Sequence, residues 1–136
     1  MKQLLIVVAI LSATGCAAQT IPADVKTAFA KSFPNITVKK WDKEDGNYEA
    51  NFSKDGETMS ATFDAKGNWM ETETDIKVSE LPASIISYIN ANYKGATAKE
   101  AAIISNPENK KLYEAEVKGK DLLFDEQGKF LKEEKD

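Results

Sequence analysis

The second half of this chain repeats the pattern of the first, and this internal repeat constrains the fold more than any other feature. Segments recur in the same order at a period of about 60 residues: Ile21-Pro22 returns as Leu81-Pro82, Phe33 as Tyr93, Tyr48-Glu49-Ala50 as Tyr113-Glu114-Ala115, and Phe63-Asp64-Ala65-Lys66-Gly67 as Phe124-Asp125-Glu126-Gln127-Gly128. This period is longer than that of ordinary solenoid repeats. The sequence therefore predicts two copies of one small αβ unit that share a sheet or a core.

Residues 1–18 are set apart from the fold. Lys2 precedes an apolar run from Leu4 to Leu11 and then small residues, which is the layout of a secretory signal peptide. Two fates fit this segment: cleavage after Ala18, or lipid attachment at Cys16, because the residues before it resemble a bacterial lipobox. We therefore expect an exported protein, either periplasmic or secreted, or alternatively one that is lipid-anchored in the cell envelope.

The predicted repeats are residues 19–77 and 78–136, which together form one domain. Cys16 is the only cysteine, so no intramolecular disulfide can hold the domain together, and apolar burial with sheet pairing must stabilise it. One unit alone would be marginally stable, which is a further reason to expect a shared core. The formal net charge is −4 at pH 7. It argues against nucleic acid and anionic membranes as partners and permits basic proteins or divalent cations.

Each predicted unit begins with a helix and continues with four strands. Proline at the first helical turn and apolar residues at a spacing of four predict helices after Pro22 and Pro82, ending at Phe33 and Tyr93. A period of two then predicts strands. These are Ile36–Asp42, Asn47–Phe52, Glu57–Asp64, Asn68–Ile76, Thr97–Ser105, Leu112–Val117, Asp121–Asp125 and Lys129–Glu133. Short Asp-Gly and Gly-closed turns make neighbouring strands antiparallel. The expected fold is α+β, with one broad curved sheet and both helices on one face.

Alternation along these strands assigns side chains to the two faces of the sheet. Tyr48, Ala50 and Phe52 with their counterparts belong to the helix-covered face, and we also assign Met70 and Leu131 to it. The opposite, open face is the candidate binding surface, and its predicted residues are Trp41, Glu49, Asn51, Trp69, Glu71, Glu73 and Phe130. Large aromatic side chains surrounded by polar ones are the usual anatomy of a protein interface. The competing interpretation places one or both tryptophans in the core through a bulge.

These residues resemble a known family. The helix-then-four-strands unit, with Val38-Lys39-Lys40-Trp41, Asp45-Gly46-Asn47-Tyr48-Glu49-Ala50, Phe63-Asp64-Ala65-Lys66-Gly67-Asn68-Trp69 and Glu71-Thr72-Glu73, resembles the PepSY-like, β-lactamase-inhibitor-protein-like family of small exported bacterial proteins. The resemblance covers nearly all of the chain after Gln19. It implies a broad antiparallel sheet, no cofactor, and a role in binding or inhibiting another protein. The cysteine pairs of the proven β-lactamase inhibitors are absent, so inhibition of a β-lactamase is not implied.

The composition argues against an enzyme. The sequence contains no histidine, which removes the usual general base, the Ser-His and Cys-His nucleophile systems and the commonest zinc ligand. Glu71, Glu73 and Asp75 lie on one side of a single strand, where calcium would find too few oxygen atoms around one point. A solvated acidic face is therefore preferred to a cation site, and we predict neither a metal nor a cofactor.

Three functions remain open. The first is a non-enzymatic exported module that binds a protein or peptide through the open face, as an inhibitor of a protease or another envelope enzyme. The second is a small-ligand or divalent-cation-binding envelope protein that uses the acidic strand from Glu71 to Asp75. The third is a structural or self-associating protein whose edge strand, Lys129 to Glu133, pairs with another copy. The sequence identifies no partner.

Overall fold

The computed structural model of the chain describes residues 20–108 and 110–135. The predicted signal segment, with Cys16 and Ala18, lies outside the described residues. The elements in chain order are α1 (Ala23–Ser32), β1 (Lys40–Glu44), β2 (Asn47–Lys54), β3 (Glu57–Phe63), β4 (Trp69–Ile76), a short 3-10 helix η1 (Val78–Glu80), α2 (Ala83–Asn92), β5 (Glu100–Ser105), β6 (Lys111–Glu116), β7 (Lys120–Phe124) and β8 (Phe130–Lys135).

The two helices form where the sequence predicts them. Pro22 and Pro82 stand immediately before α1 and α2, where a missing backbone N–H costs nothing. Each helix buries two apolar residues four positions apart, Val25 with Phe29 and Ile85 with Ile89. Each helix therefore presents one narrow apolar stripe to the sheet, as the spacing predicts.

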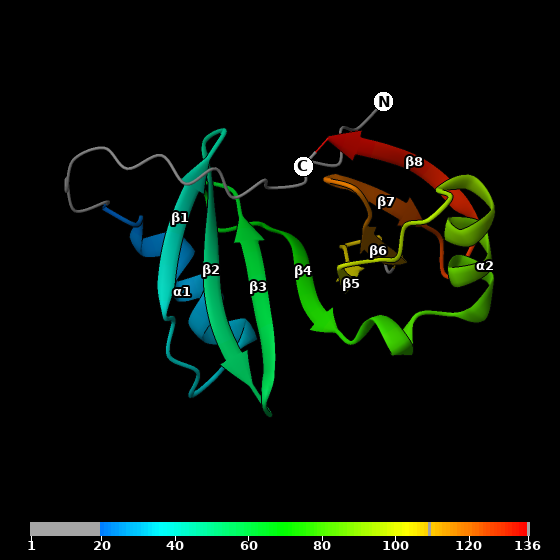
Figure 1. Cartoon of the computed structure of the whole chain (residues 1–136). Helices are drawn as coiled ribbons and strands as arrows, with labels where there is room; N and C mark the ends of the chain where they lie inside the picture. The colour runs from blue at the N-terminus through cyan, green and yellow to red at the C-terminus, as the bar shows by residue number, and fades with distance from the viewer. Residues whose placement is uncertain (1–19, 109, 136) are drawn as a thin grey trace.

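The eight strands form a single antiparallel sheet in the order β1-β2-β3-β4-β5-β6-β7-β8. Three of the hairpin turns, at Asp45-Gly46, Asp55-Gly56 and Lys118-Gly119, have positive φ at both central residues. Such turns match the right-handed twist of the strands that they connect. Figure 1 shows the sheet bending around a central space, with α1 and α2 on its outer side. The predicted α+β class with a broad antiparallel sheet is confirmed.

Both helices lie on the same face of the sheet. On β2 and β3, Ala50 pairs with Ala61, and both are buried beneath α1. On β5 and β6, Ala101 pairs with Ala115, and both are buried beneath α2. β4 lies between the strands of the two core clusters: Thr72 and Thr74 each pair with β3 on one side and with β5 on the other.

Two predicted strands begin later than expected. β1 starts at Lys40 instead of Ile36, and β5 starts at Glu100 instead of Thr97. In each case a backbone bend precedes the strand, at Lys39 and Lys99. Ile36 and Val38 pack against the core beneath α1 before the strand pairing begins. Apolar alternation alone cannot separate such a segment from a paired strand, because both bury every second side chain.

Candidate functional site

The predicted position of Trp41 on the open face is wrong. Trp41 pairs with Ala50, which is buried on the helix-covered face, and its ring lies 5.8 Å from that of Phe29 in an edge-on arrangement. The prediction assumed a regular strand from Ile36, in which Val38 and Trp41 would point to opposite sides. The bend at Lys39 breaks that alternation, so both side chains pack against the core beneath α1.

The predicted position of Trp69 is also wrong, because of a β-bulge. The register between β3 and β4 shifts at Thr62 and Phe63, so that Phe63 pairs with Trp69 while Thr62 pairs with Glu71. Met70 is the extra residue, and it moves Trp69 to the helix-covered face. There Trp69 packs against the core, and its Nε1 donates a hydrogen bond of 2.9 Å to Thr72 Oγ1.

Phe130 occupies the equivalent position in the second half, and its predicted exposure on the open face is wrong for the same reason. The register between β7 and β8 shifts at Leu123 and Phe124, so that Phe130 pairs with Phe124. The Phe130 ring stacks on Tyr88 of α2 at 4.7 Å. Leu131 is the extra residue here. It is 49% exposed, although the alternation assigned it to the core.

One sequence signal could have located both bulges. Trp69-Met70 and Phe130-Leu131 each place two large apolar residues in succession, at the same position after a Gly-closed turn. A strand that faces helices on one side only should alternate, so a doubled apolar position indicates an inserted residue. Strict alternation, in contrast, places one residue of each pair on the wrong face.

The polar part of the predicted surface is where the alternation placed it. Glu49 and Asn51 on β2 point away from the helices, because Tyr48, Ala50 and Phe52 between and beside them are buried. Glu71 and Glu73 pair with Thr62 and Ser60 on the same open face. The structure therefore separates the seven predicted residues: four acidic or amide side chains lie on the open face, and three aromatic ones lie under the helices. The binding role of these residues stays a prediction.

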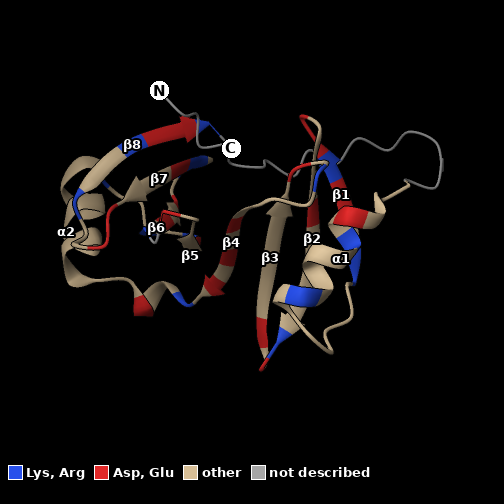
Figure 2. Cartoon of the chain, turned by 180° about the vertical axis from the view of Figure 1, so that it is seen from behind, with Lys and Arg blue, Asp and Glu red and all other residues tan. Residues whose placement is uncertain are grey.

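The bending of the sheet turns the open face into a hollow of about 750 Å³. Its lining includes Glu49, Asn51, Thr58, Ser60, Glu73, Asp75, Lys77, Lys99, Glu100, Glu114, Glu116 and Asp121, with apolar contributions from Met59, Ile76, Val78, Ala101 and Ala102. We call this feature the acidic hollow, because seven carboxylates and two lysines line it. Strands of both halves contribute, and Figure 2 shows acidic positions recurring along β4.

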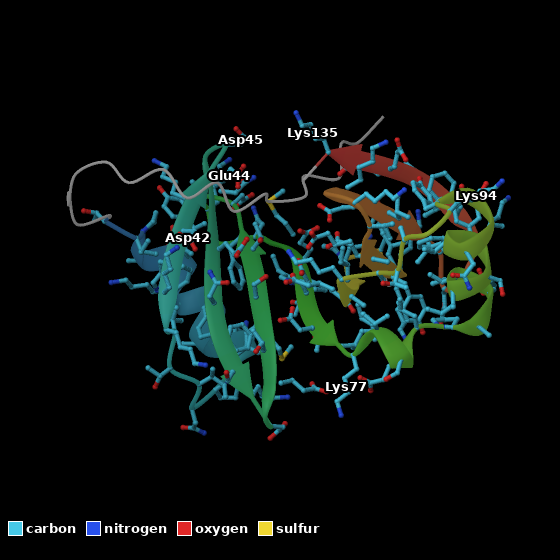
Figure 3. All side chains as sticks on the ribbon, in the orientation of Figure 1. Asp42, Glu44, Asp45, Lys77, Lys94 and Lys135 are labelled. Carbon is cyan, nitrogen blue, oxygen red and sulfur yellow. The ribbon has the colours of Figure 1, made fainter. Side chains whose placement is uncertain are left out.

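The lysines of the lining lie toward its border. Lys99 Nζ is 3.5 Å from Glu116 Oε1, and the Lys99 side chain is 73% exposed. Lys77 follows β4, and Figure 3 shows it below the space into which the side chains of the central strands point. The cationic groups therefore leave the centre of the acidic hollow to carboxylates.

A small apolar cluster lies on the same side of the sheet. Ile104, Leu112 and Leu123 pack together and are nearly or fully buried. Ile104 pairs with Glu73, and Leu123 pairs with Glu114, so these apolar residues are direct neighbours of the acids. Apolar neighbours exclude water, which makes a charge on the adjacent carboxylates costly.

Burial and mutual repulsion raise the pKa of the central carboxyls. The pKa of Glu71 rises to about 7, chiefly through desolvation and then through the charges of Glu49 and Glu134. The pKa of Glu73 also rises to about 7, again chiefly through desolvation and then through neighbouring acids, Asp75 foremost. For Glu114 the pKa rises to about 9, again through desolvation first and then through Glu73. The pKa of Glu49 is raised by burial as well.

Glu114 is the functional candidate that the sequence reasoning did not single out. Its Oε2 atom is buried and has no hydrogen-bond partner among the described residues. Alternation already placed Glu114 on the open face, so its direction could be predicted from the sequence. Its burial could not, because it depends on the curvature of the sheet.

Within residues 20–108 and 110–135, no three histidine, cysteine or acidic side chains are arranged to hold a metal ion. No helix in this part of the chain is long and apolar enough to cross a membrane.

Solved structures of similar fold come from several Bacteroides species. A DUF2874 family protein of Bacteroides ovatus is 24% identical, with a TM-score of 0.75, and the match covers 86% of this chain and 89% of that one. A protein of Bacteroides eggerthii described as periplasmic is 20% identical, with a TM-score of 0.75 and coverage of 86% and 90%. A BLIP-like protein of Bacteroides fragilis is 26% identical, with a TM-score of 0.67 and coverage of 87% and 89%.

The family assignment rests on the sequence. No curated protein matches this chain. The profile of the family described as beta-lactamase-inhibitor-like and PepSY-like matches residues 13–62 and 47–132, which is most of the chain. That description is of inhibitor-like proteins and not of enzymes. The chain belongs to the PepSY-like, beta-lactamase-inhibitor-like family.

Proposed function

We propose that this protein is an exported, non-enzymatic module that binds a basic segment of a partner protein in the acidic hollow and thereby inhibits a protease or another envelope enzyme. The acidic hollow itself is the observation that carries the proposal. It is concave, it has a volume of about 750 Å³, and carboxylates dominate its lining. A partner with lysine or arginine side chains would complement both its shape and its charge.

The mechanism of such an inhibitor is steric. A basic loop of the partner would enter between β2 to β4 on one side and β5 to β7 on the other, because both sets of strands line the acidic hollow. The bulk of the two halves would then cover the surroundings of that loop. The field of the acidic hollow would also accelerate association, an effect that added salt reduces.

Catalysis is not part of the proposal. The sequence has no histidine, and the family is described by inhibition. Export is part of it, supported by the signal-like segment up to Ala18 and by the periplasmic description of the Bacteroides eggerthii protein. Whether Cys16 carries a lipid does not change the mechanism, since both forms place the domain outside the cytoplasm.

We also propose that the two halves are copies of one unit. The support is the recurrence of helix ends and bulges. Phe33 and Tyr93 donate equivalent backbone hydrogen bonds of 2.8 Å to Phe29 and Ile89. The bulges fall at equivalent pairs, Phe63 with Trp69 and Phe124 with Phe130. The acidic hollow then arises between the copies and would not exist in one unit alone.

The proposal is tested by reversing charge in the acidic hollow. Mature protein from Gln19 and its Glu49→Lys/Glu73→Lys variant are compared for retention of envelope proteins of the source organism. We expect the variant to bind any retained partner about tenfold more weakly or worse, because like charges oppose each other at the interface. The control is Glu126→Lys, which adds a positive charge at an exposed turn between β7 and β8. Equal retention by all three proteins would contradict the proposal.

A small cationic ligand is the second candidate function, favoured by the size of the acidic hollow. Its volume lies within the range of about 300 to 1,000 Å³ that is usual for small-molecule sites. Spermidine and calcium are the informative probes. A rise in melting temperature with either, abolished in Glu73→Gln and retained in Glu126→Gln, would favour this function over protein binding.

A further inference from the structure

Glu73 and Glu114 line the acidic hollow, Glu71 lies two residues from Glu73 on β4, and the charges that raise the pKa of these three carboxyls all belong to other acids. The charges that perturb Glu71 are Glu49 and Glu134, and those that perturb Glu114 are Glu73, Asp121, Glu71 and Glu134. Glu73 is perturbed by Asp75, Glu49, Glu71 and Asp121. The three side chains come from neighbouring regions of β4 and β6, with β5 between them. No lysine is among the charges that shift the pKa of Glu71, Glu73 or Glu114.

The other charged groups on this face occur on seven strands and the segment after β4. They are Lys40, Asp42 and Glu44 on β1, Glu49 on β2, Asp75 on β4 with Lys77 beyond it, Lys99 beside Glu100 on β5, Glu116 on β6, Asp121 on β7, and Lys132 with Glu134 on β8. Most of these lysines already have partners. Lys40 pairs with Asp42 at 2.7 Å, Lys99 pairs with Glu116, and Lys132 contacts Glu134.

Carboxylates that are crowded and partly desolvated cannot all ionise at neutral pH, because each new charge raises the cost of the next. The raised pKa of about 7 for Glu71 and Glu73, and of about 9 for Glu114, expresses this cost. The Oε2 atom of Glu114 is buried and has no hydrogen-bond partner among the described residues, so no donor there would stabilise an ionised Glu114. Near pH 7 the acidic hollow therefore retains protons that isolated glutamates would have released.

We propose that binding in the acidic hollow is coupled to proton release: a lysine or arginine side chain of the partner takes the place of protons held by Glu73 and Glu114 in its lining. This inference rests on the proposed function and specifies its partner chemistry and its regulation. The bond changes are simple. Each carboxyl O–H loses its proton to the solvent, and the resulting carboxylate accepts hydrogen bonds from the ammonium or guanidinium group. A nearby cation favours the ionised carboxyl, so binding and deprotonation promote each other.

The coupling makes the affinity depend on pH in a definite direction. At acidic pH the acidic hollow is close to neutral and offers a cation little attraction. As pH rises, fewer protons have to be displaced and binding strengthens. For one proton released per bound cation, the affinity rises by up to about tenfold per pH unit. An envelope protein of this kind would therefore release its partner when its surroundings become acidic.

The first experiment measures the protons in the free protein. Side-chain carboxyl resonances of glutamate are followed by NMR from pH 4 to pH 10 in the wild type and in Glu73→Gln and Glu114→Gln. We expect the Glu114 carboxyl to titrate well above pH 7, and to titrate at a lower pH in Glu73→Gln, because one repelling charge is gone. Titration of Glu71, Glu73 and Glu114 within about half a unit of the ordinary glutamate pKa of about 4.3 would overturn the inference.

The second experiment measures the coupling with a defined probe, the acetylated and amidated peptide hexalysine. Calorimetric titration at pH 6.5 in two buffers of different ionisation enthalpy gives the number of protons released per bound peptide. We expect about one proton for the wild type and for the control Glu126→Gln, and a marked reduction for Glu114→Gln and Glu73→Gln. Far-ultraviolet circular dichroism establishes that each variant is folded.

Different experimental outcomes would contradict the proton coupling and the proposed function. Binding of hexalysine without proton release overturns the inference and leaves the proposed function standing. Equal binding by the wild type and by the Glu49→Lys/Glu73→Lys variant shows that the peptide binds elsewhere, which contradicts both. Binding that weakens from pH 8 to pH 6 in the wild type and in Glu126→Gln, and weakens markedly less in Glu114→Gln and Glu73→Gln, supports the coupling directly.

Discussion

At the scale of single residues, the structure gives the two tryptophans a different role from the one that the sequence predicts. As exposed aromatic residues they would be binding anchors, whereas in the structure they are half-buried and pack against the core beneath α1. Trp41 meets Phe29 edge-on, and Trp69 satisfies its indole N–H through Thr72. A tryptophan with its N–H satisfied and its ring against the core contributes to stability through apolar burial. A substitution of either tryptophan by alanine therefore tests folding and not binding.

We expect Trp69→Ala to lower the free energy of unfolding by about 3 kcal/mol, because it removes a large ring from the core and leaves a cavity. Chemical denaturation monitored by circular dichroism measures this loss. The matched control is Leu131→Ala, at the exposed bulge residue of the other half, which should change stability by less than about 0.5 kcal/mol. A stable Trp69→Ala protein that has lost partner binding would instead restore the aromatic surface predicted from the sequence.

At the scale of elements, the turns between β3 and β4 and between β7 and β8 fix the helices against the sheet. Gly67 has a φ of 83°, and a Cβ at this position would lie 2.6 Å from the backbone oxygen of Asp24 in α1. Gly128 is equally close to α2, where a Cβ would lie 2.1 Å from Ser84 Oγ. Each Gly-closed turn therefore provides the positive φ and also the space for the first turn of a helix.

We expect Gly67→Ala to destabilise the protein by about 2 to 4 kcal/mol, as the sum of left-handed backbone strain and overpacking against α1. Gly56→Ala is the control. Gly56 has the same φ of 83°, but nothing lies within 4 Å of its added Cβ, so only the backbone strain of about 1 kcal/mol remains. Thermal unfolding of both variants measures the difference. Equal destabilisation would show that the close approach to α1 has no energetic role.

At the scale of the whole molecule, the bending of one sheet produces both the acidic hollow and a pH-dependent stability. Glu71, Glu73 and Glu114 have a raised pKa in the folded state and an ordinary pKa, near 4.5, when unfolded. Between these values the folded protein binds more protons than the unfolded chain. Stability from these groups is therefore complete below about pH 4.5 and is lost as pH rises through about 7 and then about 9.

We expect the free energy of unfolding to fall by at least about 3 kcal/mol between pH 5 and pH 9, because a pKa difference of one unit corresponds to about 1.4 kcal/mol and a single carboxyl with a pKa of about 7, such as Glu73, accounts for that much. Urea denaturation across this range measures it. Glu114→Gln should flatten the dependence and should be more stable than the wild type at pH 9, because an amide carries no charge to desolvate. A wild-type protein whose stability is constant or increases from pH 5 to pH 9 would contradict this account.

The sequence by itself determined the local structure of this protein and most of its connectivity. Proline positions and four-residue spacing placed both helices, and Asp-Gly turns with period-two alternation placed the eight strands. These features depend on residues close together in the chain, so composition and spacing are sufficient to predict them. Alternation also placed Glu49, Asn51, Glu71 and Glu73 on the open face.

Only the tertiary structure decided where the aromatic residues lie and how the acids are surrounded. A bend at Lys39 and bulges at Met70 and Leu131 each shift the register by a small step, and one step moves a side chain to the other face of a sheet. The burial of Glu114 depends on the curvature of all eight strands, because residues from β2 through β7 line the acidic hollow. The spacing of residues along the chain does not predict the curvature of the sheet. It arises when strand twist accumulates across the sheet and the two helices pack against its outer face.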